Sequence, residues 1–253
     1  MPEGDTIHRT AERLRRALVG KTVRRFESRR QLRDRPRMGQ TVVAVEAVGK
    51  HLLIRFDGGL VLRTHMGMTG SWSTFGRGER WGRRHLARAV LEVDDVVAVC
   101  FAAPTIRTYR EGQPSGIEHL GPDLTLPEPD IDEALRRMGA IADPSTEIAD
   151  VMLDQRVAAG IGNAVKCEAL WACRQHPFTP LAEVPPDRRR QLLVVAAKHL
   201  LAGTRTRRPE AVHGRRRRPC RACGTPIELA RQGTRITFWC PTCQPDPGDV
   251  TRG

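Results

Sequence analysis

Aromatic residues are scarce in this chain of 253 residues: Phe, Trp and Tyr together make up 4% of it, and Tyr109 is its only tyrosine. Proteins that bind single-stranded nucleic acid without sequence preference stack successive bases on exposed aromatic rings. The composition therefore argues against a large stacking platform for single strands.

Long apolar segments are also missing. The sequence has no run of about 18 apolar residues, the minimum for a membrane-spanning helix, and no basic amphipathic anchor. Its start lacks the basic and then apolar order of a secretion signal, because Glu3 and Asp5 stand there. We therefore expect no membrane partner and a cytoplasmic, nucleoid-associated protein.

Positive charge is present in excess. The chain has 42 Lys and Arg against 29 Asp and Glu, which gives a formal net charge of +13 and an isoelectric point near 10.5. Such a balance favours a polyanionic partner, and nucleic acid is the first candidate. The length allows one large domain or two modest ones.

The period of the apolar residues changes along the chain. Residues 5–19 predict a helix with Asp5 or Thr6 as its cap, and residues 22–103 contain short Val- and Leu-rich runs typical of antiparallel strands. A Pro-rich stretch at 121–130 is typical of a linker or a domain boundary. Helical patterns then follow at 131–139, 146–158, 163–174 and 187–202, before a basic stretch at 204–219 that we expect to be an exposed or flexible connector.

Four of the seven cysteines form the sharpest local motif. They stand in two Cys-x-x-Cys pairs, Cys220 with Cys223 and Cys240 with Cys243, separated by sixteen residues. Paired thiolates at this spacing are typical of one structural Zn²⁺ in tetrahedral coordination, whereas disulfides are disfavoured without a secretion signal. The residues between the pairs predict a β-hairpin, whose base the metal would hold.

A second motif, "LDQRVAAGIGNAVKCEALW" at 153–171, predicts two helices joined by a glycine turn. Free backbone N–H groups at the start of the second helix, where Asn163 stands, are suited to binding phosphate. A plain helix hairpin explains the pattern equally well. Glu168 in the second helix reads either as a buried carboxylate or as an ordinary surface glutamate.

Three further positions in the sequence each allow a structural or a functional interpretation. Pro2 is either a helix-initiating proline or, after removal of Met1, an N-terminal secondary amine, and the adjacent Glu3 suits a helix N-terminus. Lys50 in "VGKHLLIRF" reads as a hairpin lysine. Met68 in "THMGMTGSW" reads as a core methionine or as an apolar wedge.

The start "MPEG", the motif at 153–171 and the terminal four-cysteine hairpin occur in this order in one family. The chain resembles the formamidopyrimidine-DNA glycosylase and endonuclease VIII family of base-excision repair enzymes, and "MPEGDT" is most like the endonuclease VIII branch with its actinobacterial members. The resemblance spans nearly the whole chain. It implies an α+β multidomain fold with DNA in the cleft between its halves.

The resemblance also implies domain bounds. We expect an N-terminal catalytic β-sandwich with flanking helices at 1–125, a helix–two-turn–helix DNA-binding domain at 126–218 and a zinc finger at 219–253. The implied partner is damaged double-stranded DNA, and we expect a monomer, since one cleft suffices.

The catalytic roles follow from the same resemblance. Pro2 is implied as the nucleophile that attacks C1′ of the damaged nucleotide, Glu3 as the general acid/base, and Lys50 as a phosphate ligand that assists catalysis. An α-amine titrates near pH 8, so part of it is neutral and nucleophilic at pH 7. The resulting iminium would permit β- and then δ-elimination at an abasic site.

DNA contacts are implied for four further residues. Met68 would fill the gap left by the extruded nucleotide, and Asn163 and Arg235 would clamp the backbone around it. Glu168 matches a carboxylate of the helix-turn-helix that lies near the active centre.

The chain departs from the family pattern in two places. The stretch "APTIRTYR" at 103–110 lacks the Arg-Phe pair usual in the formamidopyrimidine branch, and Asp5-Thr6 replaces a common acidic residue at position 6. We therefore expect oxidised pyrimidines as substrates in preference to 8-oxoguanine. The alternatives are an enzyme that acts mainly as an abasic-site lyase, a non-enzymatic zinc-ribbon nucleic-acid-binding protein, and, more weakly, a ribosome-associated protein.

Overall fold

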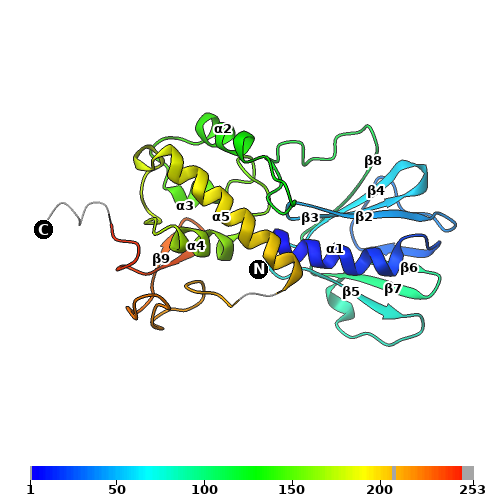
Figure 1. Ribbon diagram of the computed structural model, residues 1–253. Helices are drawn as coiled ribbons and strands as arrows, with labels where there is room; N and C mark the ends of the chain where they lie inside the picture. The colour runs from blue at the N-terminus through cyan, green and yellow to red at the C-terminus, as the bar shows by residue number, and fades with distance from the viewer. Residues whose placement is uncertain (1, 207–208, 247–253) are drawn as a thin grey trace, which may run out of the picture. The chain divides into compact units, whose positions relative to one another are not determined.

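The computed structural model describes residues 2–206 and 209–246, apart from the side chain of Ile141. The chain divides into two compact units, residues 1–118 and residues 119–253 (Figure 1). The expected catalytic β-sandwich at 1–125 reaches slightly beyond the first unit, and the other predicted segments fall within the second.

The first unit is built from two antiparallel four-stranded sheets. Their strand orders are β2-β3-β4-β8 and β1-β6-β7-β5. The helix and strands are α1 (Gly4–Leu18), β1 (Val23–Ser28), β2 (Val42–Val48), β3 (His51–Phe56), β4 (Leu60–His65), β5 (Ser71–Gly76), β6 (Ala87–Val93), β7 (Val96–Phe101) and β8 (Thr105–Arg110). Short 3-10 turns occupy Asp57–Gly59 and Arg84–Leu86.

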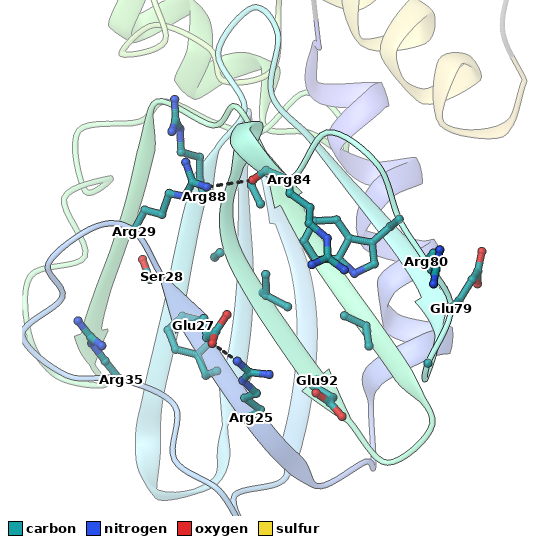
Figure 2. Close-up of a pocket in the computed structure, with 17 residues that line it drawn as sticks. Arg25, Glu27, Ser28, Arg29, Arg35, Glu79, Arg80, Arg84, Arg88 and Glu92 are labelled. Carbon is teal, nitrogen blue, oxygen red and sulfur yellow. Dashed lines mark hydrogen bonds and ion pairs between the residues drawn. The ribbon is translucent and has the colours of Figure 1, made fainter.

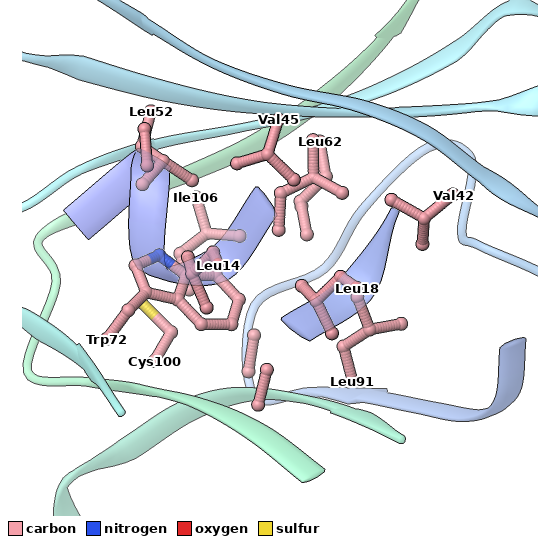
Figure 3. Close-up of a cluster of buried hydrophobic side chains, with 14 of the residues drawn as sticks. Leu14, Leu18, Val42, Val45, Leu52, Leu62, Trp72, Leu91, Cys100 and Ile106 are labelled. Carbon is pink, nitrogen blue, oxygen red and sulfur yellow. The ribbon is translucent and has the colours of Figure 1, made fainter. Parts of the chain in front are cut away.

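The apolar stripe of α1 lies in the core that the two sheets share. Ile7, Ala11, Leu14 and Leu18 recur at helical spacing and are almost completely buried. Figure 3 shows Leu14 and Leu18 among side chains from both sheets. The indole N–H of Trp72 on β5 donates to the Thr64 hydroxyl on β4 at 3.0 Å, so a polar bond also connects the sheets.

The second unit is mainly helical. Its described elements are α2 (Ile131–Ile141), α3 (Ile148–Leu153), α4 (Asn163–Ala172), a 3-10 turn (Leu181–Glu183), α5 (Pro186–Arg205) and the hairpin strands β9 (Glu228–Gln232) and β10 (Arg235–Trp239). Apolar faces of α2, α3, α4 and α5 form one core. The α+β fold class and the C-terminal β-hairpin are as predicted.

Two local predictions for the second unit are wrong. The helix expected to run to residue 158 ends at Leu153, because the Gln155 side chain replaces helical hydrogen bonds: it donates to the Leu153 carbonyl at 2.7 Å and accepts from the Gly160 N–H at 3.1 Å. The stretch 121–130 does not form a loose linker. Its Leu124 and Thr125 are buried, and the Gly121 N–H donates to the Gln155 carbonyl at 2.8 Å.

Candidate functional site

The start of α1 holds a buried carboxylate. Glu3 precedes the helix, is 5% exposed and accepts the Ile7 N–H with its backbone carbonyl at 3.0 Å, while its side chain makes no capping hydrogen bond. The adjacent Pro2 is half-buried. A carboxylate at this end of a helix is favoured by the helix dipole. Met1, whose removal would be needed for Pro2 to act as an amine, lies outside the described residues.

The prediction that Asp5 or Thr6 caps α1 is wrong, since the helix already begins at Gly4. The Asp5 carboxylate instead accepts the Thr6 backbone N–H at 2.5 Å and forms an ion pair with Arg9 at 3.1 Å. Asp5 therefore stabilises the first turn from inside the helix.

Lys50 lies in the turn between β2 and β3, beside two histidines. His51 and His65 are paired across β3 and β4, and their ring centroids are 4.8 Å apart. Burial, followed by repulsion from Lys50 and Arg63, lowers the pKa of His65. Its Nδ1 also accepts the Gly67 N–H at 3.3 Å. The Lys50 charge thus lies beside an imidazole whose protonation is disfavoured. This cluster depends on strand register and was missed in the sequence.

The loop after β4 directs Met68 outward. Met68 is 69% exposed whereas Met66 is 2% exposed, so the reading of Met68 as a core methionine is excluded. The turn is tight: the Gly70 N–H donates to the Met66 carbonyl at 2.8 Å, and a Cβ on Gly70 would lie 2.3 Å from that oxygen. The loop therefore presents one apolar side chain from a closely packed base.

In the second unit, the start of α4 is attached to β10. Gly162 is the N-cap of α4, and the Nδ2 of Asn163 donates to the Ile236 carbonyl at 2.8 Å. Ile236 directly follows Arg235, the first residue of β10. The structure thus brings Asn163 close in space to the strand residue next to Arg235, across a long sequence separation.

Glu168 has a structural role. It is 8% exposed, and its carboxylate accepts the backbone N–H groups of Ala211, Val212 and His213 at 2.8, 3.0 and 2.9 Å. The surface reading is excluded, and this geometry favours a positioning role over the direct DNA contact that the resemblance implied. Because Ala211 and Val212 are buried, the prediction that 204–219 is an exposed connector is wrong for this part.

Lys166 was missed as a candidate. It is completely buried, and its Nζ donates to the Thr237 hydroxyl at 2.7 Å. Thr237 donates in turn to Gln232 Oε1 at 2.6 Å, and Gln232 Nε2 donates to the Glu147 carboxylate at 2.5 Å. This chain of bonds connects the buried Lys166 amine on α4 through the hairpin to an acid before α3. The available signal was a lysine amid the apolar residues 165–170.

The four motif cysteines converge. Their sulfur atoms all lie within 4.8 Å of one another, with separations of 3.4 Å for Cys223–Cys240 and 3.9 Å for Cys220–Cys243. A disulfide requires about 2.05 Å. Tetrahedral coordination with metal–sulfur bonds of about 2.3 Å places sulfurs near 3.8 Å apart, so this donor set fits a tetrahedral metal ion.

The pKa values of the four thiols are shifted in both directions. Hydrogen bonds from the Thr225 hydroxyl and backbone lower the pKa of Cys223 to about 6, which favours its thiolate. Burial and neighbouring sulfurs raise the pKa of Cys243. Thiolates gathered this closely repel one another, and a bound cation would remove that repulsion.

No helix in the described ranges is both long and apolar enough to cross a membrane.

Comparison with known proteins gives matches in both units. Residues 1–107 match the model described as the formamidopyrimidine-DNA glycosylase N-terminal domain, and residues 218–245 match a zinc finger found in FPG and IleRS. The chain is 39% identical to "Probable endonuclease 8 2" of Streptomyces coelicolor, with 98% of this chain and 95% of that protein covered. It is 34% identical to "DNA-(apurinic or apyrimidinic site) lyase Nei2" of Mycolicibacterium smegmatis, with 96% and 99% covered.

Solved structures agree with this result. The MutM (FPG) protein from Thermus thermophilus has a TM-score of 0.81 at 28% identity, with 96% of this chain and 98% of that chain covered. A complex of Lactococcus lactis Fpg with DNA containing an abasic site has a TM-score of 0.85 at 18% identity, with 97% and 100% covered, a likeness of fold alone.

His65 predicts a measurable pH dependence. Because its pKa is lowered in the native protein, the unfolded chain binds a proton first as the pH falls. The stabilising contribution is complete above about pH 6.5 and is lost as the pH falls through the lowered native pKa. In urea unfolding between about pH 7 and 5, the wild type should lose stability more steeply than His65→Gln.

The control for this measurement is His85→Gln, since His85 is exposed. It should keep the steep wild-type dependence. Equal slopes for the wild type and His65→Gln would show that His65 is not held neutral.

The Lys166–Thr237 bond predicts a second effect. Thr237→Val keeps the side-chain shape but removes the acceptor of a buried ammonium, so it should destabilise the protein by about 1–3 kcal/mol and speed hydrogen exchange in β10. Thr234→Val, at an exposed position of the same hairpin, should change stability by less than about 0.5 kcal/mol. Equal effects of the two variants would contradict the role given to this bond.

Proposed function

Because the chain belongs to the formamidopyrimidine-DNA glycosylase and endonuclease VIII family, we propose that this bifunctional DNA glycosylase and abasic-site lyase acts through Pro2 on damaged double-stranded DNA. The observation that carries the proposal is Glu3, a carboxylic acid only 5% exposed, at the N-cap position of α1 directly beside Pro2. A protein that only binds nucleic acid has no need of this pair.

The chemistry begins with removal of Met1, which exposes the secondary amine of Pro2. The neutral amine attacks C1′, the bond from C1′ to the base breaks, and the base leaves with that electron pair and takes up a proton. Glu3 donates a proton to the sugar O4′ as the ring opens, and an iminium forms between Pro2 and C1′.

Elimination follows from the positive charge of the iminium. Loss of a C2′ proton sends electrons toward C1′, and the C3′–oxygen bond breaks to release one phosphate end. A second elimination breaks the C5′–oxygen bond. Water then hydrolyses the remaining iminium, which releases the sugar fragment and regenerates the Pro2 amine.

The two units supply different contacts to the DNA. Lys50 binds a phosphate beside the lesion, and the lowered pKa of His65 disfavours a further positive charge next to that ammonium. Met68 occupies the space left by the extruded nucleotide. Asn163 and Arg235 bind backbone phosphates. Glu168 supports this machinery indirectly, through the segment 211–213.

Oxidised pyrimidines are the proposed substrates. The stretch 103–110, which lacks the Arg-Phe pair, consists of the end of the short connection 102–104 and of β8, so it offers no long loop for reading the opposite base. A second candidate is an enzyme that acts mainly on abasic sites, favoured because one relative is named as such a lyase. Activity on an abasic duplex but not on a thymine-glycol duplex would select this second candidate.

The nucleophile is tested by cyanoborohydride trapping on an abasic-site duplex, followed by peptide mapping. The adduct should lie on residue 2, and an N-terminal extension that cannot be removed should reduce trapping by about 100-fold or more, because it converts the amine into an amide. The matched controls are the surface variants Lys21→Ala and Lys198→Ala, which should trap normally. Mapping of the adduct to a lysine would overturn the assignment of Pro2.

The metal is proposed to be one structural Zn²⁺ held by the four cysteines. Chelation, or Cys223→Ala, should release about one zinc per chain and abolish hydrogen-exchange protection in β9 and β10, because so small a hairpin has little apolar core. Cys173→Ala, a buried thiol outside the cluster, should retain the zinc. Persistent protection in a zinc-free chain would contradict the structural role.

A further inference from the structure

The first unit has a hollow on the face of the second sheet, which we call the arginine groove. Its volume is about 740 Å³, and its walls come from β1, β6, β7 and the segment 78–84 (Figure 2). Pro2, Glu3, Lys50 and Met68 are not among the residues that line it. The groove therefore has no part in the chemistry proposed above.

Positive charge dominates the groove. The lining arginines are Arg25, Arg29, Arg35, Arg80, Arg84 and Arg88. Figure 2 shows the labelled guanidinium groups distributed around the rim. Such an arrangement attracts an anion that reaches several of them at once.

The carboxylates of the groove neutralise only one of these arginines among the described residues. Glu27 pairs with Arg25, Glu92 pairs at 3.2 Å with Arg77 outside the groove, and Glu79 accepts the Gly76 N–H at 2.8 Å. Within the described part of the chain, no carboxylate pairs with the other five lining arginines.

The floor of the groove is apolar. Val90 and Val97 are half-buried there, and they belong to a small apolar cluster on this outer face, separate from the main core. The pairing of β6 with β7 has a register irregularity between Ala87 and Ala89. Residues two apart on a regular strand face the same side, but here Ala87 belongs to the outer cluster and Ala89 to the main core. The partner should therefore bring apolar side chains as well as negative charge.

Nucleic acid fits this surface poorly. Trp81 already packs against Phe75 with ring centroids 6.1 Å apart, against Phe101 at 5.8 Å, and beneath the Arg84 guanidinium, which lies 5.3 Å from its ring centroid. A ring engaged in this way is a poor platform for stacking a base. The phosphates of a duplex would meet the rim but leave the apolar floor uncovered.

We propose that the arginine groove docks an acidic protein segment that carries apolar side chains. Its carboxylates pair with Arg35, Arg80 and Arg88 on the rim, and its apolar side chains cover Val90 and Val97. Charge-assisted bonds to guanidinium supply specificity, and the apolar floor supplies burial that a simple polyanion cannot use.

The test uses fluorescence anisotropy with a fluorescein-labelled peptide of alternating Asp and Leu. Arg35→Glu and Arg80→Glu should each weaken binding about tenfold, a change expected for losing a charge-assisted bond and gaining a like charge. The matched control is Arg107→Glu, an equal change of charge at an exposed position on β8, which should bind as the wild type does. A peptide of alternating Asp and Ser should bind weakly to all of them.

Three outcomes would overturn the proposal. Equal weakening by Arg80→Glu and Arg107→Glu would show attraction by net charge alone, and equal affinity for the Asp–Ser peptide would remove the role of the floor. Tighter binding of oligothymidylate or duplex DNA that is sensitive to Arg35 and Arg80 would identify a nucleic-acid site instead. Cleavage of an abasic-site duplex should be unchanged in both groove variants, so this result is independent of the proposed catalytic function.

Discussion

The burial of the α1 stripe is the constraint on which the first unit depends. Ile7, Ala11, Leu14 and Leu18 occupy the core between the two sheets, so the helix cannot turn or slide without opening that core. Chain termini ordinarily fray, whereas the nucleophile proposed at Pro2 would have to approach within about 3 Å of a sugar carbon. By fixing the helix, the stripe also fixes the two residues that precede it.

In the second unit, α4 positions neighbouring segments through two buried polar side chains, Lys166 and Glu168. Lys166 holds β10 and Glu168 holds the segment 211–213, although the two residues are only two positions apart on one helix. Burying such groups costs free energy unless each is fully hydrogen-bonded, and satisfying them specifies which segments must pack against α4. The bond from Asn163 to the strand that begins at Arg235 is therefore supported by a second bond from α4 to the same strand, that of Lys166 to Thr237.

The sequence predicted features that depend on local spacing and missed those that depend on distant partners. The α1 stripe, the two cysteine pairs and the hairpin between them follow from periodicity and motif spacing. Lys166 bonds a residue 71 positions away, and Glu168 bonds backbone groups 43 to 45 positions away, so neither environment can be inferred from neighbouring residues. The pairing of His51 with His65 likewise depends on strand register, which the sequence alone did not determine.

The sequence gives the total charge of the chain but not where the charged side chains gather on its surface. In the structure, that distribution distinguishes a surface suited to nucleic acid from one suited to an acidic protein. A charge of +13 favours nucleic acid in general. Around the arginine groove, however, Glu79 and Glu92 are bound to groups outside it, Glu27 pairs with Arg25 alone, and the valines of the apolar floor are only half-buried. Like charges held together destabilise a fold, and exposed apolar side chains add nothing to phosphate binding. A DNA-repair enzyme needs positive charge to bind the phosphates of its substrate. Arginines around an apolar floor are better explained by an acidic protein partner that also carries apolar side chains.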